Sequence, residues 1–217
     1  MCGRGVRPDG VELAEAIEAE LVDEPVRSLP ARHNLAPTDP VGVLWRDAGR
    51  RRLSVARWGV ERPRGGLAIN ARDDRLRGGM WRPMLMRGRA VVPLRGFYEW
   101  EGPQRQPWYF HRTDGGLLLL AGLVSVTLDA LQTTIVTTTP SVDIGGVHDR
   151  MPAILEPDMV DPWLAGRDDA MLADLVRTAP EGTLRRHPVS RDVNSVRNDG
   201  AHLIEPAAPE PTQVDLF

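Results

Sequence analysis

Two neighbouring stretches decide the fold: residues 117–126 (LLLLAGLVSV) and 132–138 (QTTIVTT). Both are short runs of apolar and β-branched residues, a composition typical of strands buried in a sheet. Three earlier runs have the same character: 41–45, 53–60 and 89–94. Turn sequences separate the runs, among them 47–49 (DAG) and 114–116 (DGG). The middle of the chain is therefore predicted to be mainly β-structure.

Helices are expected around this sheet. The first spans Asp9–Glu24, with Asp9 as the N-cap, Glu12 three residues later, and Pro25 as the stop. The remaining expected elements are a short helix at 80–86 with Pro83 in its first turn, helices at 158–164 and 168–177, and a strand at 185–190. The fold class is α+β, a curved, mostly antiparallel sheet or open barrel with peripheral helices and no βαβ repeat.

Composition narrows the function. The chain has 217 residues and a net charge of −3, which argues against a general nucleic-acid binder. All 27 basic residues are arginine. Residues 46–95 hold 14 arginines against four acidic residues, a net charge of +10 that suits a localised anionic ligand. No apolar run is long enough to cross a membrane, and we expect a cytoplasmic protein.

The first residues carry the sharpest chemical signal. Cys2 is the only cysteine, which excludes an internal disulfide and a cysteine-rich zinc site, and no cofactor or metal is expected. If Met1 is removed, Cys2 carries an α-amine and a thiol on adjacent carbons. The α-amine titrates near about 7.7–8.0 and is partly neutral at neutral pH. Such an aminothiol can form a Schiff base with an aldehyde and close it to a thiazolidine. A lone cysteine is more often inert.

Four polar segments stand out from the surface pattern: 32–38, 69–72, 93–100 and 145–152. Each has an ordinary structural interpretation. Asn34 and Asn70 are suited to capping turns, Glu99 to pairing with an arginine, and His148 to a satisfied structural position. Together with Cys2 they supply a nucleophile, an acid, a histidine and an amide, which is a complete set for carbonyl chemistry.

In these segments the sequence resembles the SRAP family, named for an SOS-response-associated peptidase, whose members cross-link to abasic sites in single-stranded DNA. The matching motifs are MCGR (1–4), NLAPT (34–38), RWG (57–59), NAR (70–72), GFYEW (96–100) and HDRMP (148–152). The resemblance runs from Cys2 to about Pro206. It departs from a generic member in lacking lysine, so phosphate contacts must come from arginine.

The resemblance implies a thiazolidine between Cys2 and the ring-opened abasic sugar, with Glu99 moving protons, His148 assisting the Schiff-base steps, and Asn70 holding the cysteine. It also implies DNA-binding residues: Arg4, Pro37, Trp58, Arg72, Trp100 and Arg150. Trp58, Pro37 and Trp100 match apolar residues that support or stack on bases, while Arg4 and Arg72 match phosphate ligands. The implied partner is single-stranded DNA with an abasic site. We expect a monomer by default, because nothing in the sequence suggests an assembly surface, and we expect it to associate with the nucleoid. Either the protein itself or an aminopeptidase removes Met1.

The domain is expected to span 2–204, followed by a proline-rich, disordered tail at 205–217. The tail ends in Gln213-Val214-Asp215-Leu216-Phe217, which resembles the peptide by which bacterial repair proteins bind the sliding clamp. Gln213 is then expected to bind in the groove of the clamp, and Leu216 and Phe217 to fill its apolar pocket. The plain alternative is that these apolar residues dock on their own domain.

Three hypotheses for function remain from the sequence. The first is the abasic-site cross-linker. The second is an N-terminal-nucleophile cysteine peptidase or hydrolase with Cys2 activated by His148, and autoproteolysis belongs with it. The third is a non-catalytic nucleic-acid module in which Cys2 is incidental. The full motif set favours the first.

Overall fold

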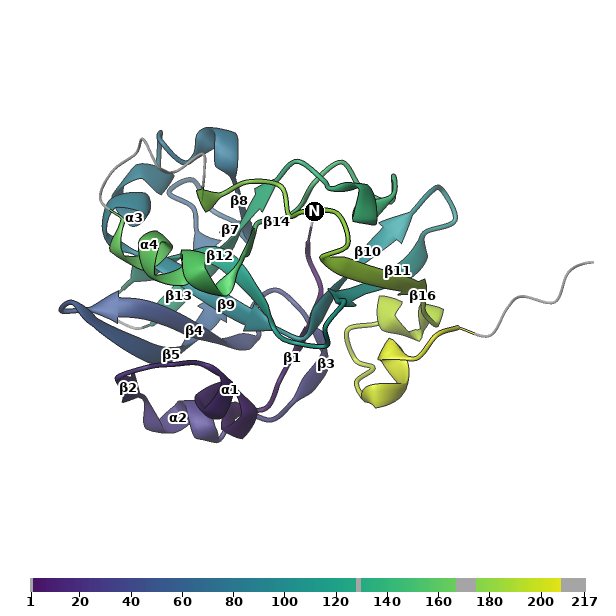
Figure 1. Ribbon diagram of the computed structural model, residues 1–217, viewed down its shortest axis with the longest axis horizontal. Helices are drawn as coiled ribbons and strands as arrows, with labels where there is room; N and C mark the ends of the chain where they lie inside the picture. The colour runs from purple at the N-terminus through teal and green to yellow at the C-terminus, as the bar shows by residue number, and fades with distance from the viewer. Residues whose placement is uncertain (1, 128–129, 167–174, 208–217) are drawn as a thin grey trace, which may run out of the picture.

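The computed structural model describes residues 2–127, 130–166 and 175–207 (Figure 1). Five strands form a closed ring: β4 (Pro40–Asp47), β5 (Arg50–Trp58), β9 (Arg89–Leu94), β12 (Leu118–Val126) and β13 (Leu131–Thr138). Four antiparallel pairs run in the order β13-β12-β9-β4-β5, and a parallel pair between β5 and β13 closes the ring. All five predicted runs are strands, and the α+β class is confirmed. The ring is closed, whereas the sequence had suggested an open barrel.

A second sheet has five strands in the order β16-β11-β10-β1-β3. Its members are β1 (Gly5–Arg7), β3 (Arg32–Leu35), β10 (Gly96–Glu101), β11 (Gln106–Arg112) and β16 (Leu184–Pro188). Only β16 was predicted as a strand. The sheet is joined directly to the barrel, because Arg95 alone separates β9 from β10. The shorter strands are β2 (Leu21–Val22), β6 (Val60–Glu61), β7 (Leu67–Ala68), β8 (Asn70–Arg72), β14 (Met151–Pro152) and β15 (Ile154–Leu155).

Short helices lie on the outside of the barrel (Figure 1). They are α1 (Gly10–Ala16), α2 (Glu24–Arg27), α3 (Trp81–Arg87) and α4 (Val160–Ala165). The 3-10 turns are η1 (Asp73–Arg75), η2 (Val142–Ile144), η3 (Pro157–Met159), η4 (Arg191–Asn194) and η5 (Ala201–Ile204), of which η2, η4 and η5 contact strands of the second sheet. The expected helices at 80–86 and 158–164 are present, whereas the one at 168–177 lies almost wholly outside the described residues. Within the described part of the chain, no helix is long and apolar enough to span a membrane.

The predicted helix over Asp9–Glu24 is wrong beyond Ala16. Asp9 is the N-cap, as expected, and accepts bonds from the amides of Val11 and Glu12. Ile17 then takes an extended conformation, with φ −105° and ψ 114°. Leu21 and Val22 form β2 beside β5, and Pro25 lies in the first turn of α2 instead of ending a helix. Pairing with the barrel edge overrides the helical spacing in this segment.

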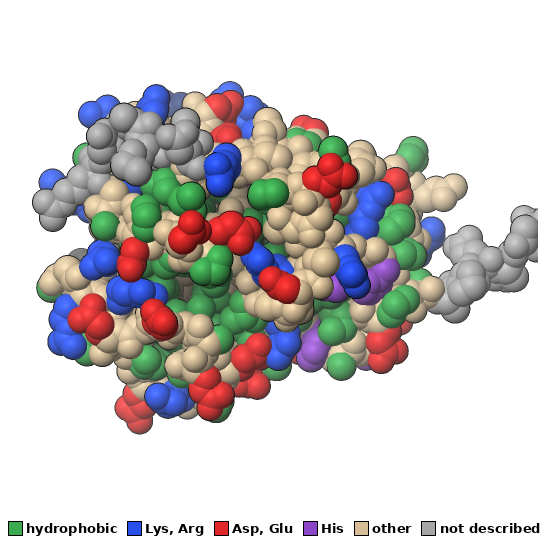
Figure 2. Space-filling view, in the orientation of Figure 1, with side chains coloured by type: hydrophobic (Ala, Val, Ile, Leu, Met, Phe, Trp, Pro, Cys, Tyr) green, Lys and Arg blue, Asp and Glu red, His purple; other side chains and the backbone are tan. Residues whose placement is uncertain are grey.

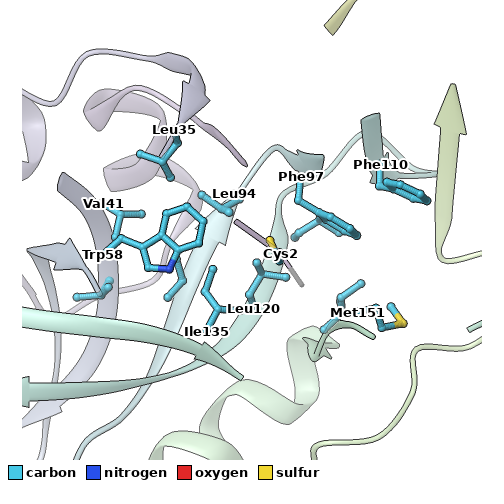
Figure 3. Packing of buried hydrophobic residues seen from close by; sticks show 14 of the residues in the cluster. Cys2, Leu35, Val41, Trp58, Leu94, Phe97, Phe110, Leu120, Ile135 and Met151 are labelled. Atoms are coloured by element: carbon cyan, nitrogen blue, oxygen red, sulfur yellow. The ribbon is translucent and has the colours of Figure 1, made fainter. Parts of the chain in front are cut away.

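Cys2 lies in the core between the two sheets. Its side chain is buried in a cluster that includes Trp58 and Leu120 from the barrel and Phe97 and Phe110 from the second sheet (Figure 3). A second cluster fills the space between the barrel and the helices, around Leu13, Leu44 and Trp163. The N-terminal residues therefore hold the two sheets together from inside.

At least seven of the 14 arginines in residues 46–95 form ion pairs within the fold. On β4 and β5, Arg46 pairs with Asp161 at 3.2 Å and Arg52 pairs with Asp23 and Asp47 at 2.8 and 2.6 Å. Basic and acidic side chains alternate over the face shown in Figure 2. The charge of this segment is therefore spread over ion pairs and gives little support for one anion site there.

We expect Gly96→Ala to destabilise the protein. A Cβ at this position lies 2.4 Å from the Phe110 carbonyl oxygen and 2.4 Å from the Tyr109 ring, so β10 and β11 must separate. Overpacking of this kind costs about 1–3 kcal/mol. Thermal unfolding should show a Tm several degrees below that of Gly78→Ala, where the added methyl meets nothing within 4 Å. Equal Tm values for the two variants would contradict this account of the hairpin.

Candidate active site

Strand β1 places the start of the chain beside Glu99. Gly5 lies opposite Phe97 and Val6 opposite Gly96 in an antiparallel register. The Tyr98 amide donates to the Arg4 carbonyl at 3.1 Å. Continuing the same register puts Gly3 opposite Glu99. The pairing of β1 with β10 thus fixes the residues that follow Cys2, and with them the position of Cys2.

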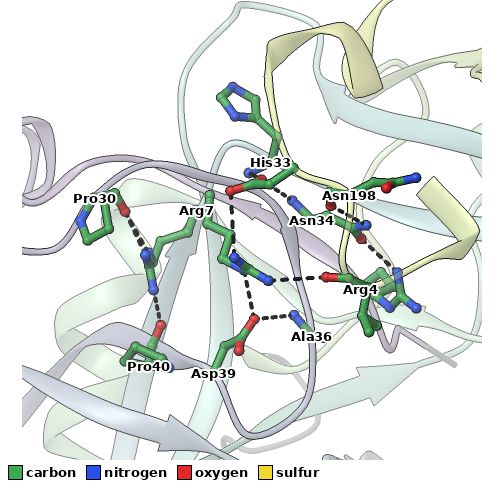
Figure 4. A network of polar contacts seen from close by, with 12 residues as sticks. Arg4, Arg7, Pro30, His33, Asn34, Ala36, Asp39, Pro40 and Asn198 are labelled. Atoms are coloured by element: carbon green, nitrogen blue, oxygen red, sulfur yellow. Dashed lines mark hydrogen bonds and ion pairs between the residues drawn. The ribbon is translucent and has the colours of Figure 1, made fainter. Parts of the chain in front are cut away.

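Two arginines hold this segment in place (Figure 4). Arg4 donates through Nη1 to Asn34 Oδ1 and to the Val193 carbonyl, both at 2.7 Å. Arg7 is buried and donates to the carbonyl oxygens of Pro30 and Pro40. Hydrogen bonds to a charged donor are stronger than neutral ones. The first strand is therefore clamped on both sides.

Asn34 is a structural hub and does not reach the site. Its side chain is completely buried. Its Nδ2 lies within 3.1 Å of three carbonyl oxygens, those of Val193, Ser195 and Asn198. These contacts fix the segment that contains η4 over the second sheet, where Asn194 reaches the site.

Glu99 is a buried carboxyl group on β10. It is 2% exposed, and burial raises its pKa from 4.5 to about 7. Strand alternation puts Phe97 and Glu99 on one face of β10. Tyr98 and Trp100 take the other face, against the cluster around Val193 and Leu203. Glu99 is thus in a position to exchange a proton near neutral pH.

The Cys2 thiol is a neutral group in this environment. Burial is the largest cause that raises its pKa, and the nearby carboxylate of Glu99 adds to it. Its Sγ lies 3.8 Å from the Arg4 carbonyl oxygen. A thiol in this position needs a neighbouring base to lose its proton, since it is not a thiolate at neutral pH.

Asn70 contacts Cys2 directly. It begins β8, which runs parallel to β13 with Asn70 opposite Ile135. Its Nδ2 donates to the Cys2 carbonyl at 2.8 Å. Its Oδ1 is buried and has no hydrogen-bond partner among the described residues. One end of the amide therefore contacts Cys2, and the other end is an acceptor that no described residue uses.

His148 lies in a loop between two anchors, the buried side chains of Val147 and Met151. The loop turns at Gly145 and Gly146, which have φ values of 56° and 80° that favour glycine. The Arg150 amide donates to His148 Nδ1 at 3.0 Å, and Asp149 Oδ1 lies 2.8 Å from the same nitrogen. These two contacts require different protonation states of Nδ1. Burial lowers the pKa of His148, so we assign the neutral ring that accepts from Arg150, with the proton on Nε2.

These groups converge on one pocket of about 520 Å³, lined by Gly3, Arg4, Glu99, Trp100, Arg105, His148 and Asn194. Cys2 lies behind this wall and Asn70 contacts Cys2 from β8. The described residues contain no group of three or more His, Cys, Asp or Glu that could hold a metal.

The pocket contains two residues that the sequence did not reveal. Arg105, in the turn between β10 and β11, stands 5.7 Å from the centroid of the Trp100 ring, and Arg4 stands 5.9 Å from it. Asn194 Oδ1 accepts from Trp100 Nε1 at 2.6 Å. An arginine in a turn and an asparagine near a 3-10 turn carry no distinct sequence signal.

Two of the expected DNA-binding side chains point inward. Trp58 is 1% exposed and donates from Nε1 to the Ile69 carbonyl at 3.0 Å, so a base cannot stack on it in this structure. Arg150 is 9% exposed and donates to Asp73 at 2.7 Å and to the Thr137 carbonyl. Both support the site from within.

The other expected DNA-binding residues lie nearer the surface. Trp100 and Arg4 line the pocket, and Pro37 is half-buried. Arg72 is exposed and is held by Asp74. The expected tail residues Gln213, Leu216 and Phe217 lie outside the described residues. The described contacts continue to Ala207, whose amide donates to the Pro188 carbonyl, beyond the boundary expected at 204.

Comparison with known families gives the same assignment. The model of the family described as SOS response associated peptidase (SRAP) matches residues 1–196. The chain belongs to the SRAP family. The resemblance inferred from the motifs is therefore confirmed.

This SRAP chain is similar to relatives and to a solved structure over nearly its whole length. It is 30% identical to the abasic site processing protein YedK of Escherichia coli, with 95% of this chain and 100% of the relative covered. It is 30% identical to the abasic site processing protein YoqW of Bacillus subtilis, with 94% and 99% covered. A protein from Bacteroides thetaiotaomicron has the same fold, with a TM-score of 0.79 at 18% identity over 95% of this chain and 100% of that one.

The burial of Glu99 predicts a pH-dependent stability. Its folded-state pKa of about 7 lies above the ordinary 4.5, so the folded state holds the proton more tightly. Stability is therefore full below 4.5, declines as the pH rises to about 7 and then stays flat. Glu99→Gln removes this loss and should gain up to about 3 kcal/mol at pH 8, with little gain at pH 4.5. Urea unfolding at both values checks it, with the exposed Glu101→Gln as the control. An equal gain at both would contradict it.

Proposed function

We propose that this protein binds single-stranded DNA and forms a covalent thiazolidine between Cys2 and the ring-opened sugar of an abasic site, which shields the lesion. The observation that carries the proposal is the pocket lined by Glu99 and His148 next to Cys2, which Asn70 holds from β8; Glu99 is close enough to raise the pKa of the Cys2 thiol, and its own pKa of about 7 fits proton transfer at neutral pH. The names of the relatives, abasic site processing proteins, support it.

The first steps expose and capture an aldehyde. Protonated Glu99 gives its proton to the ring oxygen of the sugar, so that the C1′–O bond breaks while the hydroxyl of C1′ loses its proton to water and becomes the aldehyde oxygen. With Met1 removed, the Cys2 amine attacks the aldehyde carbon to give a carbinolamine. Loss of one water then leaves the imine. If Met1 is retained, the nitrogen of Cys2 is part of the Met1–Cys2 peptide bond. An amide nitrogen is not nucleophilic, so this attack is blocked.

The last step closes the ring. The Cys2 sulfur adds to the imine carbon, a C–S bond forms, and the former imine nitrogen takes a proton from water. Because the thiol starts protonated, a base must accept its proton, and Glu99 is ionised after its first transfer. The net reaction joins one aldehyde and one aminothiol and releases one water, so Glu99 returns to its starting state.

Asn70 and His148 hold the reacting atoms. Asn70 Oδ1 is an available acceptor beside Cys2, and we assign it to the N–H or hydroxyl of the carbinolamine. His148, with its proton on Nε2, donates to the sugar or its phosphate and assists the Schiff-base steps. Since an abasic site has no base to recognise, the aldehyde and backbone must supply specificity.

Proteins bind single-stranded DNA by pairing basic side chains with the phosphates and stacking bases on aromatic side chains, and we assign the same contacts here. Arg72 is the exposed phosphate ligand, Trp100 and Pro37 are the apolar contacts, and Arg105 adds a cation beside Trp100. We propose that the protein acts as a monomer at the nucleoid.

The hydrolase alternative has less support. A cysteine peptidase needs a thiolate, which an adjacent imidazolium stabilises. Here burial raises the pKa of the Cys2 thiol, and His148 Nδ1 is engaged by the Arg150 amide. Autoproteolysis is then confined to a single event, removal of Met1, and an aminopeptidase is the alternative agent.

The decisive prediction is a stable DNA adduct that depends on Cys2. After incubation with single-stranded DNA containing one abasic site, the intact mass of the wild type should increase by the DNA mass less one water, and the adduct should survive denaturation. Cys2→Ala keeps an N-terminal amine once Met1 is removed, so it should give an adduct only after borohydride reduction. Equal, borohydride-independent adducts from both proteins would sink the thiazolidine mechanism.

The same spectra report processing of Met1. If Glu99→Gln retains Met1 while Cys2→Ala, expressed in parallel, loses it, an aminopeptidase cannot be the sole agent. Loss from both assigns the step to an aminopeptidase.

For the tail we propose recruitment by the bacterial sliding clamp through Gln213, Leu216 and Phe217. The proposal rests on the sequence pattern alone. In a pull-down with purified clamp, we expect wild type to be retained and the Leu216→Ala/Phe217→Ala variant to be lost, while both still cross-link DNA. Equal retention of the two proteins would contradict recruitment by the clamp through the tail.

A further inference from the structure

Two arginines flank the candidate site in a similar way. Arg72 follows Asn70 by two residues on β8, and Arg150 follows His148 by two residues in the next loop. Both lie at the end of β13, since Arg72 is opposite Thr137 in the sheet and Arg150 donates to the Thr137 carbonyl. The cations are thus tied to the same part of the barrel as the reacting groups.

Adjacent aspartates of η1 hold these two cations. Asp73 accepts from Arg150 Nη2 at 2.7 Å. Asp74 accepts twice from Arg72, with Nε to Oδ1 at 3.0 Å and Nη2 to Oδ2 at 2.8 Å. The second pair is bidentate, the geometry with which an arginine binds two phosphate oxygens.

The two pairs differ in whether they can open. The side chains of Arg150 and Asp73 are 11% and 25% exposed, and Asp73 also accepts from the Thr138 hydroxyl at 2.8 Å. Breaking this pair leaves buried charge uncompensated. The side chains of Arg72 and Asp74 are 47% and 52% exposed. Exposed ion pairs contribute little, because water replaces the partner.

We infer that Asp74 is an intramolecular stand-in for a DNA phosphate, which occupies Arg72 until the strand displaces it. This rests on the proposed function, since it takes Arg72 as a phosphate ligand. The carboxylate matches the shape and charge of the incoming group, so every DNA strand must first compete with it. Asp74 therefore weakens the reversible binding of any single strand, damaged or intact, and leaves more of the discrimination to the covalent step at Cys2.

The test uses reversible binding alone. The probe is a short fluorescein-labelled single strand with a tetrahydrofuran residue, an abasic analogue that cannot open to an aldehyde. The variant is Asp74→Asn, which keeps the shape and removes the charge. The matched control is Asp114→Asn, because Asp114 holds Arg112 two residues before it through the same kind of chelate, with Nε to Oδ1 at 3.1 Å and Nη2 to Oδ2 at 3.0 Å. Asp114 lies in the turn after β11 and does not line the pocket of Glu99 and His148.

We expect Asp74→Asn to bind the probe about two- to five-fold more tightly than Asp114→Asn, in line with the small worth of an exposed pair. In the Arg72→Ala background, the same Asp74→Asn change should bring no gain. Equal affinities for Asp74→Asn and Asp114→Asn, or a gain that persists without Arg72, would overturn the inference.

The outcome is independent of the cross-linking experiment. If the wild type cross-links a genuine abasic strand but Asp74→Asn behaves as Asp114→Asn does, the proposed function stands and the stand-in role fails. If the wild type forms no adduct, the proposed function fails, and the probe still reports whether Asp74 competes for Arg72.

Discussion

The arrangement of the site depends on an N-terminal segment that is fixed in one position. Chain ends usually fray, because few contacts restrain them. Here β1 lies between β10 and β3, Arg4 reaches Asn34 and the Val193 carbonyl, and Arg7 is buried against backbone carbonyls. Cys2, the nucleophile of the proposed reaction, then occupies a fixed position. The segment around η4 closes this arrangement from the far end of the sequence, so the first and last parts of the domain build the same pocket.

The chemistry of the site follows from the same burial. Removing Glu99 and Cys2 from water raises the pKa of both groups, so the site holds protons that solvent-exposed groups would have released. For Glu99 this costs stability above its ordinary pKa and, in the proposed mechanism, provides a general acid near neutrality. For Cys2 it suppresses the thiolate, which in that mechanism limits side reactions of the thiol until an imine is present. A stability cost and a catalytic property thus share one cause.

The sequence predicts the barrel better than the sheet that positions the site. The five apolar runs identify β4, β5, β9, β12 and β13 because each is long enough to show strand composition. β1 and β3 of the second sheet, and β8, which pairs with β13 of the barrel, are three or four residues long and each includes an arginine, so no periodicity marks them. The error over 17–24 has another origin, since Leu21 and Val22 fit a helical pattern but pair with the edge of β5.

The site residues divide in the same way. Motif matching brought together Cys2, Asn70, Glu99 and His148, because their chemistry is visible in their residue types. It could not tell Arg72 from Arg150, which are the same residue type two positions after a site residue. Burial separates them: Arg150 lies against Thr137 and Asp73 inside the fold, and Arg72 lies at the surface with Asp74. The less exposed ion pair, Arg150 with Asp73, fixes the loop of His148, whereas the more exposed pair, Arg72 with Asp74, is exchangeable. The two arginine–aspartate pairs on either side of β13 therefore have opposite roles, one structural and one exchangeable. The burial of each pair alone decides its role.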